Sequence, residues 1–225
     1  MAKYSIRPLI SLYNKHADPD KARQMRAYMK DQFDYLGLPS PLRRELTKQF
    51  YKAYDYPLPE HVEAVVMEAY RLPQREFRYF ALELLVKMRE KTGHDAILLY
   101  ERLITDEPWW DTIDLIAPSL VGFHFQQYPA ERNHYINNWI KSGNIWLQRS
   151  CILFQLKYKS HTDTRLLSRI ILELRDSKEF FIRKAIGWAL REYSKTDPGF
   201  VIRFVQTNEL SGLSQREALK WLERI

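Results

Sequence analysis

Apolar residues recur along most of the chain at intervals of three and four, which is the spacing of one face of an α-helix. The clearest runs are Val62, Val65, Val66 and Ala69, and then Phe77, Ala81, Leu84, Leu85 and Met88. Strict alternation of apolar and polar residues, the pattern of a half-buried strand, is hard to find anywhere in the sequence. The pattern therefore predicts an all-helical protein.

Proline, glycine and capping residues divide this pattern into about a dozen helices. The first strong helix starts at Asp18-Pro19, a capping residue followed by proline at the first helical position, and is expected to run to Gly37. It should carry Tyr28. Ser40-Pro41 repeats the start signal, and an earlier helix from Ile6 to His16 is expected to cap the array.

The helices repeat with a period of 35 residues, because Trp146 to Tyr158 matches Phe181 to Tyr193 at that offset. The same step makes six positions of every second helix equivalent: Arg44, Tyr79, Asp114, Arg149, Lys184 and Leu219. The alternate helices carry a second set: Tyr28, Glu63, Leu98, Asn133, Ser168 and Arg203. This pattern predicts an α-solenoid of about six HEAT-like helical hairpins, in which one helix of each pair lines a concave face.

No composition shift or low-complexity linker interrupts the chain, so residues 1–225 are expected to form a single domain. The N-terminus lacks an apolar leader, and no window approaches the roughly 18 apolar residues of a membrane span, which favours a cytoplasmic protein. A single cysteine, Cys151, excludes an intramolecular disulfide and a four-thiolate zinc site. The histidines are scattered and the usual catalytic motifs are missing, so we expect no metal-dependent catalysis.

The chain carries 35 basic and 28 acidic residues, a net charge of +7 that suits a polyanion such as nucleic acid. Basic residues of the repeat-equivalent helices, among them Arg44 and Lys184, alternate with tryptophan and tyrosine. Many of them must simply face solvent, yet a concave basic surface with aromatic residues would also suit duplex DNA, because phosphate contacts supply most sequence-independent affinity. Tyr28 could be one of these aromatic residues.

Asp114 lies after the first turn of its predicted helix among isoleucine and leucine residues, where an unpaired carboxylate would be costly. The repeat places Arg149 at the same position of the next repeat, so the two side chains should project near each other, with Lys184 following. A structural salt bridge and a functional site are equally good interpretations of this pair. Trp110 lies one turn before Asp114, and Trp188 lies one turn after Lys184 in its own helix.

Three residues adjacent to these candidates in the sequence, or close to them, have structural interpretations. Trp109 is expected in the core, and Asp111 is expected to stabilise the helix N-terminus through the helix dipole. Gly187 costs about 1 kcal/mol of helix stability relative to alanine, so it indicates the close approach of another group or a helix-packing contact.

Five sequence blocks, taken in order, resemble the HEAT-like alkylpurine DNA glycosylases of bacteria, the AlkD type, over nearly the whole chain. The blocks are Met25-Arg26-Ala27-Tyr28-Met29-Lys30, Leu72-Pro73-Gln74-Arg75-Glu76-Phe77, Trp109-Trp110-Asp111-Thr112-Ile113-Asp114, Asn144-Ile145-Trp146-Leu147-Gln148-Arg149 and Lys178-Glu179-Phe180-Phe181-Ile182-Arg183-Lys184-Ala185-Ile186-Gly187-Trp188. The resemblance implies an all-α superhelix whose concave face holds duplex DNA, and excision of the cationic bases N7-methylguanine and N3-methyladenine. It further implies a monofunctional glycosylase without lyase activity, metal or cofactor. A solenoid with a DNA-sized groove can work as a monomer.

By the same resemblance the catalytic carboxylate is Asp114, the two indoles that line the lesion site are Trp110 and Trp188, and the supporting arginine is Arg149. Tyr28 matches a tyrosine of the same cleft. An alkylated purine is already a good leaving group, so a carboxylate need only stabilise positive charge on the deoxyribose and orient the attacking water. Arg149 would contact a flanking phosphate and hold the carboxylate ionised, and the family acts without a base-binding pocket.

Two other functions fit the same sequence. A non-catalytic HEAT-repeat scaffold that binds protein is the commonest use of such solenoids, and it predicts no salt-sensitive binding to DNA. A protein that binds branched or damaged duplexes without cutting the glycosidic bond would share the basic face, but it would not require Asp114.

Overall fold

The computed structural model describes residues 4–224 of the chain. Helices make up all of the regular structure in these residues, and the only β-type contact there is an isolated bridge between Asp34 and Gln74. The predicted all-helical fold is confirmed. Contacts divide the chain into two compact units, one up to Thr92 and the other from Gly93 onward. The single domain expected from composition stays a prediction.

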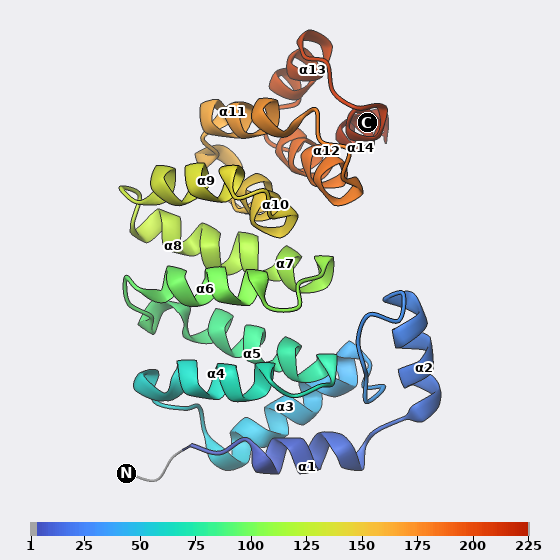
Figure 1. Ribbon diagram of the computed structural model, residues 1–225, viewed down its shortest axis with the longest axis vertical. Helices are drawn as coiled ribbons and strands as arrows, with labels where there is room; N and C mark the ends of the chain where they lie inside the picture. Colours follow the sequence, from blue (N-terminus) through green and yellow to red (C-terminus); the bar gives the residue numbers. More distant parts are fainter. Residues whose placement is uncertain (1–3, 225) are drawn as a thin grey trace. The chain divides into compact units, whose positions relative to one another are not determined.

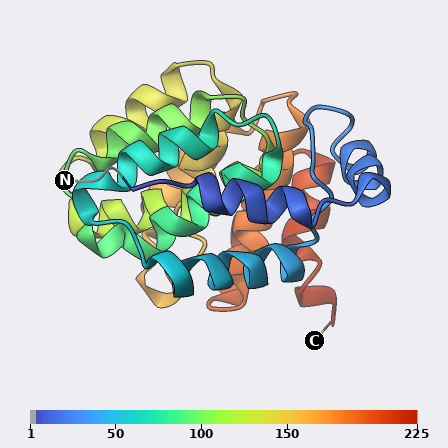
Figure 2. The same ribbon diagram turned by 90° about the horizontal axis from the view of Figure 1, so that it is seen from below.

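The described residues of the N-terminal unit form five α-helices, whose arrangement is drawn in Figures 1 and 2. They are α1 (Arg7–Lys15), α2 (Pro19–Tyr28), α3 (Ser40–Tyr54), α4 (Val62–Tyr70) and α5 (Arg75–Met88). Helix α1 packs beside α3, and α4 packs against α5. Phe50, Phe77 and Phe80 are fully buried in the core of this unit.

The C-terminal unit contains the remaining α-helices. They are α6 (Ala96–Thr105), α7 (Trp110–Ile116), α8 (Gly122–Gln127), α9 (Arg132–Lys141), α10 (Ile145–Leu153), α11 (Thr164–Leu174), α12 (Phe180–Ser194), α13 (Pro198–Thr207) and α14 (Gly212–Leu219). Helices α7, α10, α12 and α14 follow one another, each packed against the next, and α6, α9, α11 and α13 form the alternate row (Figure 1). Within the described residues, no helix is long and apolar enough to cross a membrane.

The predicted repeat agrees with these helices. The six positions equivalent to Asp114 lie in α3, α5, α7, α10, α12 and α14, and the alternate six lie in α2, α4, α6, α9, α11 and α13. The expected first helix, Ile6 to His16, is α1 with one flanking residue at each end. The 35-residue spacing therefore reported the alternation of helices correctly.

Helix α2 starts as predicted but ends early. The Asp18 carboxylate caps it by accepting from the backbone N–H groups of Asp20 and Lys21, each at 3.1 Å. The helix ends at Tyr28 rather than at Gly37, so the predicted end was wrong.

The backbone leaves the helical conformation at Lys30 and Asp31, with φ of +56° and +55°, and a buried carboxylate of α5 holds the loop that follows. The backbone N–H groups of Leu36, Gly37 and Leu38 all donate to Glu76, at 2.9 to 3.1 Å. Donors held in this way cannot serve a continuing helix. Gly37 has φ +85°, and a Cβ there would lie 2.1 Å from the carbonyl oxygen of Asp18, so glycine is required at this turn.

Helices α7 and α8 are joined by a π-helical segment, η3 (Ala117–Val121). Pro118 has no N–H to donate to the carbonyl of Asp114, four residues earlier, and its ring would crowd that carbonyl in a regular α-helix. The wider π turn accommodates the proline, and the helical run continues from Trp110 to Gln127. The backbone irregularity thus begins one turn after Asp114.

Candidate functional site

The core of the candidate site is an ion pair between α7 and α10 of the C-terminal unit. Arg149 donates from Nε to Oδ1 of Asp114 at 2.9 Å, and from Nη2 to Oδ2 at 3.0 Å. This bidentate arrangement is the strong form of a guanidinium–carboxylate contact. The predicted proximity of the two repeat-equivalent residues is confirmed as a direct contact.

The two partners differ in their exposure to solvent. The Arg149 side chain is 5% exposed, whereas the Asp114 side chain keeps 21% of its surface accessible. Burial raises the pKa of the Asp114 carboxyl above its ordinary value, and the charge and hydrogen bonds of Arg149 oppose that rise. A carboxylate in this setting is partly desolvated and still reachable.

Phe181 of α12 completes the environment of Arg149. Its carbonyl oxygen accepts a third hydrogen bond, from Arg149 Nη1 at 2.6 Å, and its ring centroid lies 6.0 Å from the guanidinium carbon. The ring also packs on Trp109 and Trp146, at centroid distances of 5.2 and 4.9 Å. Trp109 therefore packs in an aromatic cluster, but it is half-buried and does not lie in the core as predicted.

Phe181 was not predicted as a site residue, although the repeat gave a reason to consider it. The 35-residue overlay aligns it with Trp146, and both side chains now pack in one aromatic cluster beside Arg149. The sequence could not indicate the role of its carbonyl oxygen, because every residue has a backbone carbonyl.

The two indoles expected to line the site lie on helices of the same row as Asp114. Trp110 is the first residue of α7, one turn before Asp114, and it is half-buried. Trp188 lies in the middle of α12 and is half-buried as well. Since α10 packs against both α7 and α12, the carboxylate, the arginine and the indoles come from three successive helices of one row.

Lys184 forms an ion pair with Glu217 of α14. Its Nζ lies 3.0 Å from Oε1 of Glu217 in α14, and the same carboxylate binds Arg191 at 3.0 Å and also Lys220. Burial would raise the pKa of Glu217, but the hydrogen bonds from Lys220 and Lys184 lower it to about 2. The structure therefore pairs Lys184 with Glu217, a residue that the sequence did not single out, and not with the Asp114 carboxylate.

Gly187 allows α12 and α14 to pack closely. A Cβ at this position would lie 2.4 Å from the Cβ of Glu217 and 2.8 Å from the carbonyl oxygen of Ser214. The helix-packing interpretation of this glycine is confirmed. It also explains how Glu217 comes within reach of the cations on α12.

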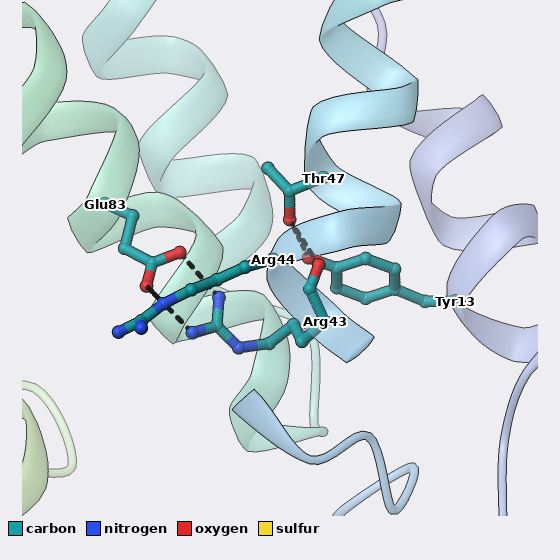
Figure 3. A network of polar contacts seen from close by, with 5 residues as sticks. All are labelled: Tyr13, Arg43, Arg44, Thr47 and Glu83. Atoms are coloured by element: carbon teal, nitrogen blue, oxygen red, sulfur yellow. Dashed lines mark hydrogen bonds and ion pairs between the residues drawn. The ribbon is translucent and has the colours of Figure 1, made fainter. Parts of the chain in front are cut away.

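The remaining candidate residues belong to the N-terminal unit. Tyr28 is the last residue of α2 and is 73% exposed. Arg44 on α3 donates from Nε to Oε1 of Glu83 on α5 at 3.1 Å, while the buried Arg43 holds both oxygens of that carboxylate at 2.7 and 2.8 Å (Figure 3). Thr47, a turn further along α3, is bonded to Tyr13. Arg44 is therefore an exposed cation anchored by one carboxylate.

In the described part of the chain, no group of three or more His, Cys, Asp or Glu side chains is arranged to hold a metal ion. The chemistry that the arrangement offers is electrostatic. A carboxylate that is partly desolvated and held by two hydrogen bonds stabilises positive charge more strongly than one in water.

The chain is similar to one protein family and to solved structures. The profile of the family described as "DNA alkylation repair enzyme" matches residues 9–222. A solved structure described as a "predicted DNA alkylation repair enzyme from Enterococcus faecalis" superposes with a TM-score of 0.84 at 32% sequence identity, covering 93% of this chain and 98% of that one. The crystal structure of smu.31 from Streptococcus mutans UA159 is similar in fold, with a TM-score of 0.58 at 17% identity over 93% of this chain and 98% of that one. The curated proteins gave no match.

Proposed function

Because the chain belongs to the family of DNA alkylation repair enzymes, we propose that it is a DNA glycosylase for positively charged alkylated purines. Its substrates would be N7-methylguanine and N3-methyladenine in duplex DNA, and the reaction would be hydrolysis of the N-glycosidic bond. The observation that carries the proposal is the Asp114 carboxylate, which Arg149 holds at two oxygens and which remains 21% exposed. The net charge of +7 agrees with a polyanionic substrate.

In the proposed reaction the protein does not have to protonate the departing base. The positive charge of the alkylated purine already makes it a good leaving group, so no general acid is required. As the bond to the base lengthens, positive charge develops on the deoxyribose, and the Asp114 carboxylate stabilises that charge and orients the attacking water. Neutral lesions lack the leaving-group advantage and should be processed poorly.

The indoles and the arginine have supporting roles in this proposal. Trp110 and Trp188 present aromatic faces, which attract cationic groups by about 0.5 to 2 kcal/mol each depending on desolvation. Arg149 is 5% exposed and has three donors engaged within the protein, which favours positioning of Asp114 over a direct phosphate contact. Tyr28, Arg44 and Lys184 remain candidate DNA contacts.

A DNA-binding protein without catalytic activity is the second candidate function. It is favoured by the same ion pair, since both oxygens of Asp114 already accept hydrogen bonds from Arg149, as a purely structural bridge between α7 and α10 would require. The two candidates differ in whether the carboxylate is needed for bond cleavage.

A base-release assay decides between them. Duplex DNA that contains N7-methylguanine is incubated with the protein in the presence of a metal chelator, and free base is quantified. We expect release by the wild type and by Asp111→Asn, a matched change in the first turn of the same helix. Asp114→Asn should lose about 100-fold or more of the rate while still binding the duplex in a salt-sensitive manner.

The other results would each point elsewhere. Salt-sensitive binding without release by the wild type, or full release by Asp114→Asn, contradicts the proposed catalysis and favours the DNA-structure binder. Absence of binding favours a protein scaffold. Strand breaks that appear before alkali treatment would contradict the expected lack of lyase activity.

A further inference from the structure

The N-terminal unit contains a cavity of about 260 Å³ between α3 and α5. Arg44, Lys48 and Tyr51 of α3 line one side, and their spacing of four and three residues places them on one helix face. Glu83 and Lys87 of α5 line the other side, again one turn apart. Tyr56, which follows α3 in the chain, also lines the cavity.

The cavity is electropositive. Its single lining carboxylate, Glu83, already accepts hydrogen bonds from both Arg43 and Arg44 (Figure 3). Lys48 and Lys87 are exposed at the cavity, and neither has an ion-pair partner among the described residues. Cations that surround one saturated carboxylate leave an excess of positive charge, so the complementary ligand is an anion.

The cavity also carries a stack of aromatic rings. Tyr51 lies between two rings, with centroids 5.8 Å from Phe80 and 4.1 Å from Tyr56, and both pairs are nearly parallel. Tyr56 ends the stack and is 44% exposed, with Lys87 Nζ 6.0 Å from its centroid. A further planar ring could extend this stack, since offset stacking of aromatic rings is favourable.

The side chain of Tyr51, which lines the cavity, also carries a polar group with no partner among the described residues. The Tyr51 hydroxyl is buried and makes no hydrogen bond to any described residue, which is unusual for a buried polar atom. Burial raises the pKa of Tyr51, so the hydroxyl keeps its proton and can donate.

We propose that this cavity binds a nucleotide, with its phosphate at Lys48, Lys87 and Arg44 and its base stacked on Tyr56. Neither the charge nor the aromatic stack alone requires a nucleotide, but a phosphate joined to a planar ring matches both. The volume is slightly below the 300 Å³ or so at which sites for drug-sized ligands begin, so it suits a single nucleotide. The source is either a free nucleotide or an unpaired nucleotide of a DNA strand. The proposal goes beyond base excision. It shares Arg44 with the candidate DNA contacts and uses no residue of the Asp114 site.

Calorimetric titration of the full chain tests the proposal. The ligands are 2′-deoxyadenosine 5′-monophosphate, deoxyadenosine, inorganic phosphate and a short single-stranded oligonucleotide with a 5′-phosphate. We expect the monophosphate to bind about tenfold or more tightly than either the nucleoside or inorganic phosphate, because each of these lacks half of the recognised chemistry. Tighter binding of the oligonucleotide than of the monophosphate assigns the site to DNA, and the reverse order assigns it to a free nucleotide.

Two matched pairs of variants locate the binding. Lys48→Glu should weaken it about tenfold, whereas Lys52→Glu, the same charge change on an exposed residue of α3 outside the cavity, should leave it within about twofold. Tyr56→Ala should weaken binding of the monophosphate, and Tyr54→Ala, an exposed tyrosine that does not line the cavity, should not. Far-ultraviolet circular dichroism of all four variants confirms that they are folded.

Three results would overturn the proposal: no binding of the monophosphate or the oligonucleotide, inorganic phosphate binding as tightly as the monophosphate, or equal weakening by Lys48→Glu and Lys52→Glu. The Asp114→Asn variant should bind the nucleotide as the wild type does. A failure of base release therefore leaves the nucleotide result interpretable, and a failure of nucleotide binding leaves the glycosylase proposal untouched.

Discussion

Arg149 and Asp114 lie 35 residues apart in the chain and are joined by two hydrogen bonds, from Nε to Oδ1 at 2.9 Å and from Nη2 to Oδ2 at 3.0 Å. The contact links α10 to α7 and leaves part of the carboxylate accessible. It therefore has two separable consequences, one for the stability of the C-terminal unit and one for the proposed chemistry.

The stability consequence is measurable by a double-mutant cycle. Arg149→Met should lower the free energy of unfolding by about 3 kcal/mol, because it leaves the Asp114 carboxylate partly buried without its cation. Combining it with Asp114→Asn should cost less than the sum of the two changes, with a coupling of about 0.5 to 3 kcal/mol. Urea unfolding of the four proteins gives the values. Strict additivity would mean that the ion pair contributes nothing to folding.

The chemical consequence is a pH dependence of base release. The proposed reaction needs Asp114 ionised, and burial raises the pKa of this carboxyl above 3.8. The rate should therefore decline as the pH falls, with a midpoint above 3.8, because protonation removes the charge that stabilises the sugar cation. Single-turnover rates from acid to neutral pH measure the midpoint. The residual rate of Asp114→Asn should lack this limb, and an identical limb in that variant would assign the titration to another group.

Substitution of Gly187 tests the packing of α12 on α14. Alanine favours a helix by about 1 kcal/mol over glycine, but its Cβ would come within 2.4 Å of the Cβ of Glu217. We expect the clash to prevail and Gly187→Ala to lower the free energy of unfolding by about 1 to 3 kcal/mol. Gly93→Ala is the matched control, because a Cβ there meets nothing within 4 Å. Equal urea midpoints for the two variants would contradict the close contact.

The Glu217 cluster should affect stability in acid. The pKa of Glu217 is about 2 in the folded protein, below the 4.5 of an ordinary glutamate, so its ionised form favours the folded state. Its stabilisation is fully present above about pH 4.5 and is lost as the pH falls toward 2. In Glu217→Gln the free energy of unfolding should be lower by about 1 to 3 kcal/mol at neutral pH, and its decline between pH 4.5 and 2 should be shallower. Urea unfolding at several pH values compares the two slopes, and parallel slopes would exclude Glu217 as their source.

The regular part of the fold could be predicted because its causes are local or periodic. Asp18 and the proline that follows it mark the start of α2, since a cap and a preset φ act within a few residues. The 35-residue period placed Asp114 and Arg149 at equivalent positions, and equivalent positions of adjacent repeats are neighbours in a stack. The proximity of the two residues therefore followed from the repeat, whereas the hydrogen bonds between them were shown only by the structure. The repeat did not predict how deeply each of the two side chains is buried.

The chain by itself determined the helical class, the alternation of the two helix rows and the proximity of Asp114 to Arg149. Only the tertiary structure decided that α2 stops at Tyr28, where the loop that follows gives its donors to Glu76, and that Lys184 binds Glu217. The reason is physical. Helix period and capping depend on residues a few positions apart, whereas the carboxylate that a cation or a backbone donor meets depends on the packing of helices that are distant in sequence.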